Sequence, residues 1–204
     1  MLKKAGLLVV LLMALPLAAF ADNQIDFTNS GGTLTGSNSG LSLSNSVLIA
    51  VNGLNGGGLV AGTNLGSFSF STGALTSGSL QMGGTFAAGG TVSIVGNGIN
   101  GVTLGTIFTG SFSSPVTWSM ILAANGTHNY ILIGAISGTF SNGHTVNGAM
   151  AQLTINTKGL YNGKTGISSG DTNLSSVTPE PGTLVLFGTG LLGLAGALKR
   201  KIQS

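Results

Sequence analysis

The residues of this chain that could carry out acid–base chemistry are few. Its two histidines are His128 and His144, and the carboxylates of its central part are Asp22, Asp26 and Asp171. A histidine titrates near neutral pH, so it can act as a general acid or base and, beside a carboxylate, can activate a serine. Both histidines follow Asn-Gly turn signals, however, and the aspartates stand near the two ends of the central part. We therefore expect two solvent-exposed loop histidines and no catalytic residue.

The chain lacks the residues that several other kinds of catalytic or binding site require. The chain has no cysteine, which excludes a disulfide scaffold, a Cys-ligated metal and a thiol nucleophile. A glycosidase pair would have to come from the terminal aspartates, because no glutamate lies between Asp22 and Val177. Gly56-Gly57-Gly58 is not followed by the Lys-Ser/Thr of a phosphate loop, and no cluster of carboxylates suits calcium. The sequence predicts no enzyme, no metal site and no cofactor.

Three large aromatic residues offer a different chemistry. Trp118, Tyr130 and Tyr161 could form a platform on which sugar rings stack, as aromatic residues of extracellular β-proteins often do. Against this, Trp118 falls on the apolar side of the alternating segment 116–122. Core packing is therefore the favoured interpretation of Trp118, and sugar stacking is the alternative.

The distribution of charge excludes nucleic acid as a partner. The chain has 204 residues, with 7 basic and 4 acidic side chains and a net charge of +3. No charged residue lies between Asp26 and Lys158, and apart from Lys158 and Lys164 the basic residues stand at the two ends of the chain: Lys3, Lys4, Lys199, Arg200 and Lys201. Binding to phosphates needs lysines or arginines clustered on the folded surface. The central part lacks such a cluster.

The N-terminal segment has the three parts of a secretory signal peptide. A short basic region, 1–6, precedes an apolar run, 7–17, and the small residues Ala19 and Ala21 follow. A signal peptidase would accept these small residues and cut between Ala21 and Asp22. An uncleaved anchor is the alternative, but the apolar run is shorter than the roughly 20 residues that cross a bilayer.

The C-terminal segment combines an extended triplet, an apolar run and a basic cluster. Pro179 and Pro181 hold the Pro179-Glu180-Pro181 triplet extended, the conformation that a protease or transpeptidase can accept. Residues 182–198 would form a helix of about 25 Å, long enough for a thin bilayer. By the positive-inside rule, Lys199, Arg200 and Lys201 would hold the end of this helix in the cytoplasm.

This tail resembles the PEP-CTERM sorting signal of Gram-negative bacteria. The resemblance rests on Pro179-Glu180-Pro181, on the Gly-rich apolar run and on the final basic cluster. It implies recognition by exosortase, a membrane-embedded cysteine transpeptidase that cuts near the triplet, removes the span and passes the protein outward. It also implies an association with exopolysaccharide and biofilm. The alternative is a permanent membrane anchor that follows two prolines by chance.

The central part is expected to be all-β. Apolar residues alternate with serine, threonine or asparagine in several segments, which is typical of half-buried strands: 41–51, 67–71, 108–113, 116–122 and 149–156. Residues 130–140 are apolar on both faces, which suggests a central strand covered on both sides. Asn-Gly pairs between the segments are typical of type I′ hairpins. We expect an antiparallel sandwich or barrel, with a β-solenoid as the alternative.

These observations define four segments. They are a signal peptide, 1–21, a β-rich extracellular domain, 22–158, a flexible linker, 159–177, and a sorting signal with a transmembrane helix, 178–201. The expected protein is exported, non-enzymatic and sorted to the cell surface or matrix through an inner-membrane intermediate. Signal peptidase and exosortase would process it, and exopolysaccharide is a further candidate partner. The alternative function is an extracellular carbohydrate-binding module.

Overall fold

A computed structural model gives the structure of residues 24–157 and 159–175. The predicted signal peptide, 1–21, and sorting signal, 178–201, lie outside these described residues. Ala21, Asp22, the Pro179-Glu180-Pro181 triplet and the Lys199-Arg200-Lys201 cluster therefore remain predictions.

The described residues form β-strands joined by turns, with a short 3₁₀ turn at Leu54–Gly56 and no α-helix among them. The strands are β1 (Gln24–Ser30), β2 (Thr33–Ser37), β3 (Gly40–Asn52), β4 (Val60–Ser71), β5 (Leu75–Ser79), β6 (Gly83–Phe86), β7 (Gly89–Asn97), β8 (Leu104–Phe112), β9 (Val116–Leu122), β10 (His128–Phe140), β11 (Thr145–Thr157), β12 (Lys164–Gly166) and β13 (Ser169–Ser175). This confirms the all-β class.

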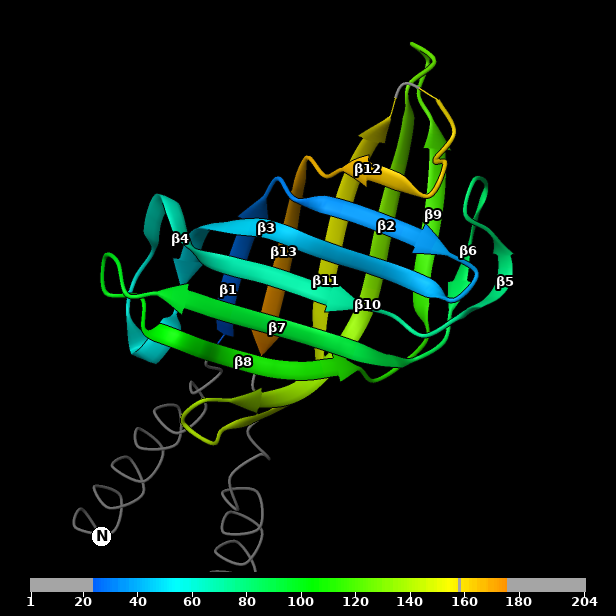
Figure 1. Cartoon of the computed structure of the whole chain (residues 1–204). Coiled ribbons are helices and arrows are strands. Elements are labelled where there is room, and N and C mark those ends of the chain that lie inside the picture. Colours follow the sequence, from blue (N-terminus) through cyan, green and yellow to red (C-terminus); the bar gives the residue numbers. More distant parts are fainter. Residues whose placement is uncertain (1–23, 158, 176–204) are drawn as a thin grey trace, which may run out of the picture. The chain divides into compact units, whose positions relative to one another are not determined.

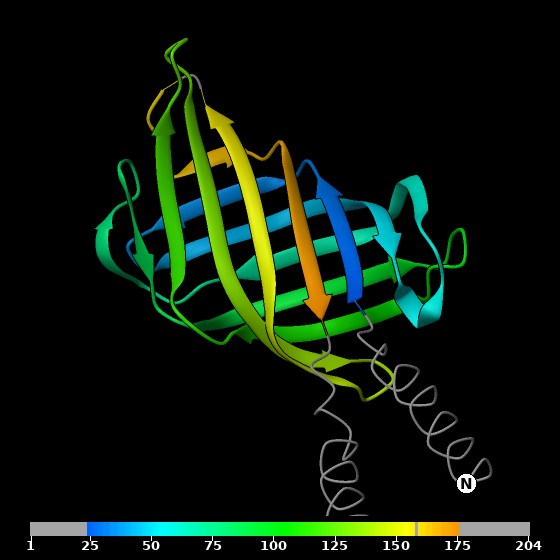
Figure 2. The same ribbon diagram turned by 180° about the vertical axis from the view of Figure 1, so that it is seen from behind.

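Eight of these strands close into an antiparallel barrel. The order around the barrel is β11-β13-β1-β3-β4-β7-β8-β10, and the ring closes because β10 also pairs with β11. In Figure 1, β2, β3, β7 and β8 cross in front of β1, β13, β11 and β10, and Figure 2 shows the same layers from behind. The predicted barrel is confirmed. The β-solenoid alternative is wrong, since the strands pair in an antiparallel manner.

Two long strands, β3 and β10, each pair with one strand outside the ring of eight as well as with their neighbours in the barrel. On one edge, β3 pairs with β1 near its end and with β2 near its start. Similarly, β10 pairs with β9 over His128–Ile133 and with β8 over Ile136–Phe140. The strands β2–β12 and β9–β6–β5 therefore extend the barrel wall at these branch points. A register shift with an extra residue on β3 lies at the first branch, between Leu43 and Ser46. Another lies between Ile136 and Gly138, where β10 begins to pair with β8.

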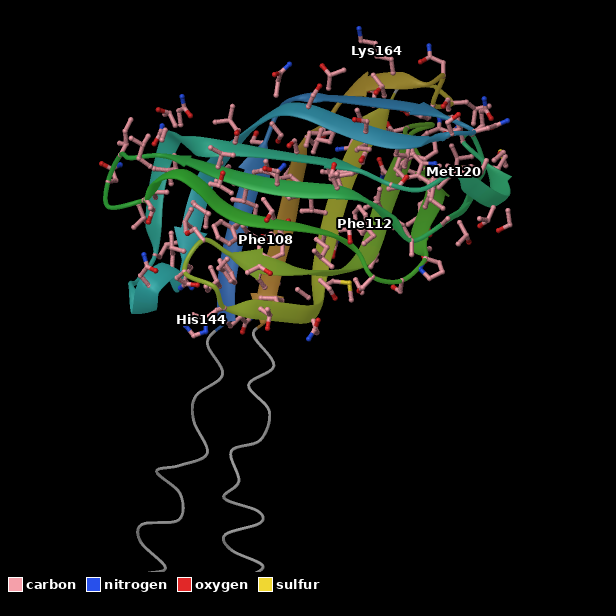
Figure 3. The ribbon with its side chains drawn as sticks, turned by 60° about the horizontal axis from the view of Figure 1, so that its bottom comes forward. Phe108, Phe112, Met120, His144 and Lys164 are labelled. Atoms are coloured by element: carbon pink, nitrogen blue, oxygen red, sulfur yellow. The ribbon has the colours of Figure 1, made fainter. Side chains whose placement is uncertain are left out.

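Apolar side chains from alternating strand positions fill the barrel. Phe108 and Phe112 are buried inside it, as Figure 3 shows, and their rings contact Phe140 and Phe70 with centroids 5.3 Å and 5.6 Å apart. Glycine makes room for one of these rings: a Cβ at Gly134 would lie 2.6 Å from the Phe112 ring. The half-buried strands predicted from alternation are thus confirmed.

The prediction that segment 130–140 is covered on both sides is wrong. Strand β10 is central in the sheet, because it pairs with three neighbours. Its inner residues Tyr130, Leu132 and Ile136 are fully buried, but Ile133 on the outer face remains 39% exposed. Ile131 and Ala135 on the same face are half-buried, so these apolar residues lie on the outer side of the barrel wall.

The predicted linker, 159–177, contains two strands, so that prediction is also wrong. Lys164–Gly166 forms β12 and Ser169–Ser175 forms β13, which pairs with β1 on one edge and with β11 on the other. Thr172 and Leu174 point into the barrel and are 1% and 0% exposed. Of the three inward positions of β13, only Leu174 is large and apolar, since the other two are Gly170 and Thr172.

Six of the eight Asn-Gly pairs were predicted to form hairpin turns: 52–53, 55–56, 97–98, 100–101, 125–126 and 142–143. All six lie at turns, although most are not of the predicted type. Their glycines all have a positive φ, between 73° and 86°, but among their asparagines only Asn55 and Asn100 do, each with a φ of 54°. The β9–β10 turn shows the commoner arrangement: Gly126 N–H donates to the Ala123 carbonyl at 2.9 Å. A negative φ at Asn followed by a positive φ at Gly is typical of a type I turn with a G1 bulge.

Candidate functional site

The structure places the two histidines at opposite ends of one hairpin. His128 begins β10 and is half-buried, and its Nδ1 is buried without a hydrogen-bond partner among the described residues. His144 lies in the β10–β11 turn, where it is exposed (Figure 3). A strand of 13 residues spans roughly 40 Å, so the two imidazoles cannot act on one substrate. The prediction of an exposed loop histidine holds for His144 only.

Two of the three predicted carboxylates come together on the outside of the barrel. Asp26 of β1 and Asp171 of β13 lie on adjacent strands, and Thr28 Oγ1 donates a hydrogen bond to Asp171 Oδ1 at 3.3 Å. Burial, the negative charge of Asp171 and a hydrogen bond with Asp171 raise the pKa of Asp26 from its ordinary value of 3.8. The ends of the domain meet because its first and last strands are neighbours, which the sequence pattern did not indicate.

This carboxyl pair does not have the geometry of a glycosidase. The two catalytic carboxyl groups of such enzymes stand at least about 5 Å apart, so that a sugar or a water fits between them. Asp26 and Asp171 are instead neighbours on adjacent strands, near enough for the charge of Asp171 to raise the pKa of Asp26. Neither histidine lies on β1 or β13. Within residues 24–157 and 159–175, no group of three His, Cys, Asp or Glu side chains could hold a metal ion.

Replacing Asp26 with asparagine should make the protein more stable at pH 7. Because the pKa of Asp26 is raised in the folded state, this carboxyl favours folding below its unfolded pKa, and that contribution is lost as the pH rises through the folded pKa. Asp26→Asn removes the ionisation and keeps the shape. Urea unfolding at pH 7 and pH 3 should show a stabilisation that shrinks at the lower pH. The same gain at both pH values would contradict this explanation.

The three aromatic residues proposed as a sugar platform are buried. Trp118, Tyr130 and Tyr161 are 1%, 0% and 1% exposed, and Trp118 stacks on Tyr130 with centroids 4.9 Å apart and an interplanar angle of 16°. Tyr161 packs against both rings at 5.6 Å and 6.0 Å. Core packing of Trp118 is therefore confirmed, and the platform is wrong.

Hydrogen bonds fix this aromatic cluster at one end of the barrel. Trp118 Nε1–H donates to the Leu80 carbonyl at 2.9 Å, and the Tyr130 hydroxyl donates to the Gln81 carbonyl at 2.8 Å. The Tyr130 oxygen also accepts from the Tyr161 backbone N–H at 2.9 Å. Burial raises the pKa of Tyr161 to about 12, so its phenol stays neutral at physiological pH. The cluster joins β9 and β10 to the β5–β6 turn and to the loop before β12.

The first and last residues of the barrel domain lie close in the sequence to the predicted processing sites. Gln24 pairs with Ser175, so β1 begins where β13 ends. The predicted signal-peptidase site between Ala21 and Asp22 and the Pro179-Glu180-Pro181 triplet each lie only a few residues beyond this pair in the sequence. The chain therefore enters and leaves the barrel at the same place in its wall.

The described part of the chain, 24–157 and 159–175, contains no helix long and apolar enough to cross a membrane. The predicted span at 182–198 and its basic flank, Lys199, Arg200 and Lys201, lie outside that part.

Comparison with known proteins identifies the C-terminal tail. The family model of the PEP-CTERM protein-sorting motif matches residues 177–201. No curated protein and no solved structure matches the chain. The motif indicates an exported, exosortase-processed protein of the cell envelope or surface. The chain is therefore a PEP-CTERM domain-containing protein whose sorting motif directly follows an antiparallel β-barrel.

Proposed function

We propose that this protein is a non-enzymatic barrel of the cell surface or extracellular matrix, delivered by two processing steps. Signal peptidase cuts between Ala21 and Asp22. The apolar run 182–198 then holds the exported chain in the inner membrane, with Lys199, Arg200 and Lys201 in the cytoplasm. Exosortase cuts near Pro179-Glu180-Pro181 and releases the barrel, which associates with exopolysaccharide. The observation that carries this proposal is the sorting motif at 177–201.

Only a few residues separate the end of β13 from the segment that exosortase would recognise. Pro179 is four residues beyond Ser175, and even a fully extended chain covers only about 14 Å over that distance. Only a short stretch of chain thus separates the triplet from β13. Exosortase must therefore act beside a folded domain, or else before the last strand has been inserted.

The same topology requires the barrel to close after export. Strand β13 lies between β1 and β11, so the first and last parts of the domain must meet before the ring is complete. Most of the chain has left the translocon by the time Ser175 emerges. Folding therefore takes place outside the cytoplasm, while the tail still holds the chain in the membrane.

The polar groups of the barrel support a non-enzymatic role. His128 and His144 are separated by the length of β10, and the Asp26–Asp171 pair has no histidine on its strands. The remaining outer surface is built from hydroxyl, amide and apolar side chains, because no charged residue lies between Asp26 and Lys158. Such a surface suits contact with a hydrated polysaccharide matrix.

Replacing Pro179, Glu180 and Pro181 together with alanine should block the second processing step. In a host that has an exosortase, the variant is expected to accumulate in the membrane with its tail attached, because the extended recognition segment is lost. Mass spectrometry of the wild type should find termini at Asp22 and near Glu180. The matched control is Pro115→Ala, which changes an exposed proline before β9 and should be processed normally. A mature wild-type protein that ends at Ser204 would contradict the proposal.

A further inference from the structure

An open groove of about 370 Å³ crosses the outer face of β3, β4 and β7. Val47, Ser67 and Val95 pair with one another across the three strands and form one row of its lining. Both valines are half-buried, whereas the serine is exposed. In the neighbouring row Gly66 pairs with Gly96, so that no side chain rises there. The central row of the groove is thus formed by two valines with the exposed Ser67 hydroxyl group between them.

Asparagine amides lie around this lining. Asn45 has a left-handed backbone with a φ of 55° at the bend of β3, and Asn64 precedes Gly66 on β4. Asn97 is held in place: its Oδ1 accepts from Ile99 N–H at 3.1 Å, and its Nδ2 donates to the Asn64 carbonyl. Within the described part of the chain, the side chains of Asn45, Asn64 and Ser67 have no hydrogen-bond partner. They are therefore free to bind a ligand.

In a second groove, by contrast, polar side chains of the lining are hydrogen-bonded within the protein. That groove, of about 330 Å³, lies along β2 and β3 and is lined by hydroxyl groups, among them Ser71 and Thr72. Thr72 Oγ1 accepts from Leu41 N–H and donates to the Gly73 carbonyl, and the Ser71 hydroxyl bonds to Thr91. Ser71 and Thr72 of this second groove thus use their hydroxyl groups within the fold, whereas Asn45, Asn64 and Ser67 of the first groove do not.

We propose that the amide groove, formed by Asn45, Val47, Asn64, Ser67 and Val95, binds a neutral sugar unit. Amide and hydroxyl groups both donate and accept, as the hydroxyl groups of a sugar require. The valines can contact the apolar C–H face of a sugar ring. The volume lies at the lower end of the range for ligand pockets, about 300–1,000 Å³. No charged residue lies between Asp26 and Lys158, so the groove offers no ion pair to an anionic ligand.

The test is an NMR titration of the full-length protein in a detergent that has no sugar headgroup. The probes are maltotetraose, cellotetraose, mannotetraose and chitotetraose, with an alginate tetrasaccharide as the anionic comparison. At least one neutral probe should shift the side-chain amide signals of Asn45 and Asn64 in a saturable manner. No saturable shift with any neutral probe, shifts only outside the groove, or tighter binding of alginate would each overturn the proposal.

Variants separate binding in the groove from effects on folding. Ser67→Trp places a large ring in the groove and should abolish binding, whereas Ser119→Trp, at an exposed serine of β9, should leave it unchanged. Asn64→Ala should weaken binding about two- to tenfold, the loss of one neutral hydrogen bond. Equal losses in both tryptophan variants would overturn the proposal. The well-dispersed spectrum of a folded protein is required of every variant that is compared.

Discussion

Replacing Trp118 with alanine is expected to lower the free energy of unfolding by about 3–5 kcal/mol, the usual cost of removing a buried tryptophan. Its side chain is 1% exposed and contacts the rings of both Tyr130 and Tyr161. The variant also loses the 2.9 Å hydrogen bond to the Leu80 carbonyl, which connects β9 to the β5–β6 turn. The effect should therefore fall in the upper part of that range.

The measurement is urea unfolding followed by far-UV circular dichroism, because Trp118 is the only tryptophan and fluorescence would be lost with it. Ile121→Ala is the matched control: Ile121 belongs to the same strand but is 52% exposed, so its loss should change stability by about 0.5 kcal/mol or less. If Trp118→Ala were as stable as this control, the aromatic cluster would not support the barrel.

The sequence predicted most of the barrel wall where one strand face is apolar. Segment 116–122 was predicted from its alternation and is β9 with unchanged bounds. Alternation also indicated that Trp118 points inward, and it does. Such positions can be predicted from the sequence because the burial of a large apolar side chain decides which face of a half-buried strand points inward.

Strand β13 could not be predicted in this way, because two of its three interior positions, Gly170 and Thr172, are small or polar. A Cβ at Gly170 would lie 2.6 Å from Asn29 Oδ1, so the glycine makes room for a fully buried asparagine of β1. Asn29 Nδ2 in turn donates to Ser46 Oγ at 2.7 Å. A polar side chain on one strand thus faces a glycine on the next, and neither strand shows an apolar face at that point.

The candidate sites depend on register, which the sequence does not show. Asn45 and Asn64 lie on different strands and approach one groove only because Val47 pairs with Ser67. Register shifts lie on both sides of this pair, between Leu43 and Ser46 and between Leu48 and Ala50, and the left-handed Asn45 stands in the first of them. No apolar pattern marks either shift. Similarly, Asp26 and Asp171 meet only because the first strand pairs with the last.

Removing β13 is expected to unfold the domain. A chain of residues 22–168 would leave β1 and β11 with unpaired edges and would lose the buried side chains of Thr172 and Leu174. A barrel has no edges while it is closed, so opening it exposes backbone groups of two strands at once. The loss should exceed the total stability of a typical domain, about 5–15 kcal/mol. We expect an aggregated product without a cooperative unfolding transition.

The matched control is a chain of residues 22–176, which also lacks the sorting tail but keeps β13. It should be monomeric by size-exclusion chromatography and should unfold in one transition. If 169–177 were a flexible linker, the two chains would have the same melting midpoint, and that result would contradict the closed barrel. A synthetic peptide of residues 169–176 should restore the transition to the shorter chain, because an added strand can pair with the free edges of β1 and β11. Rescue by this peptide, and not by one of the same composition in scrambled order, would show that pairing in this register closes the ring.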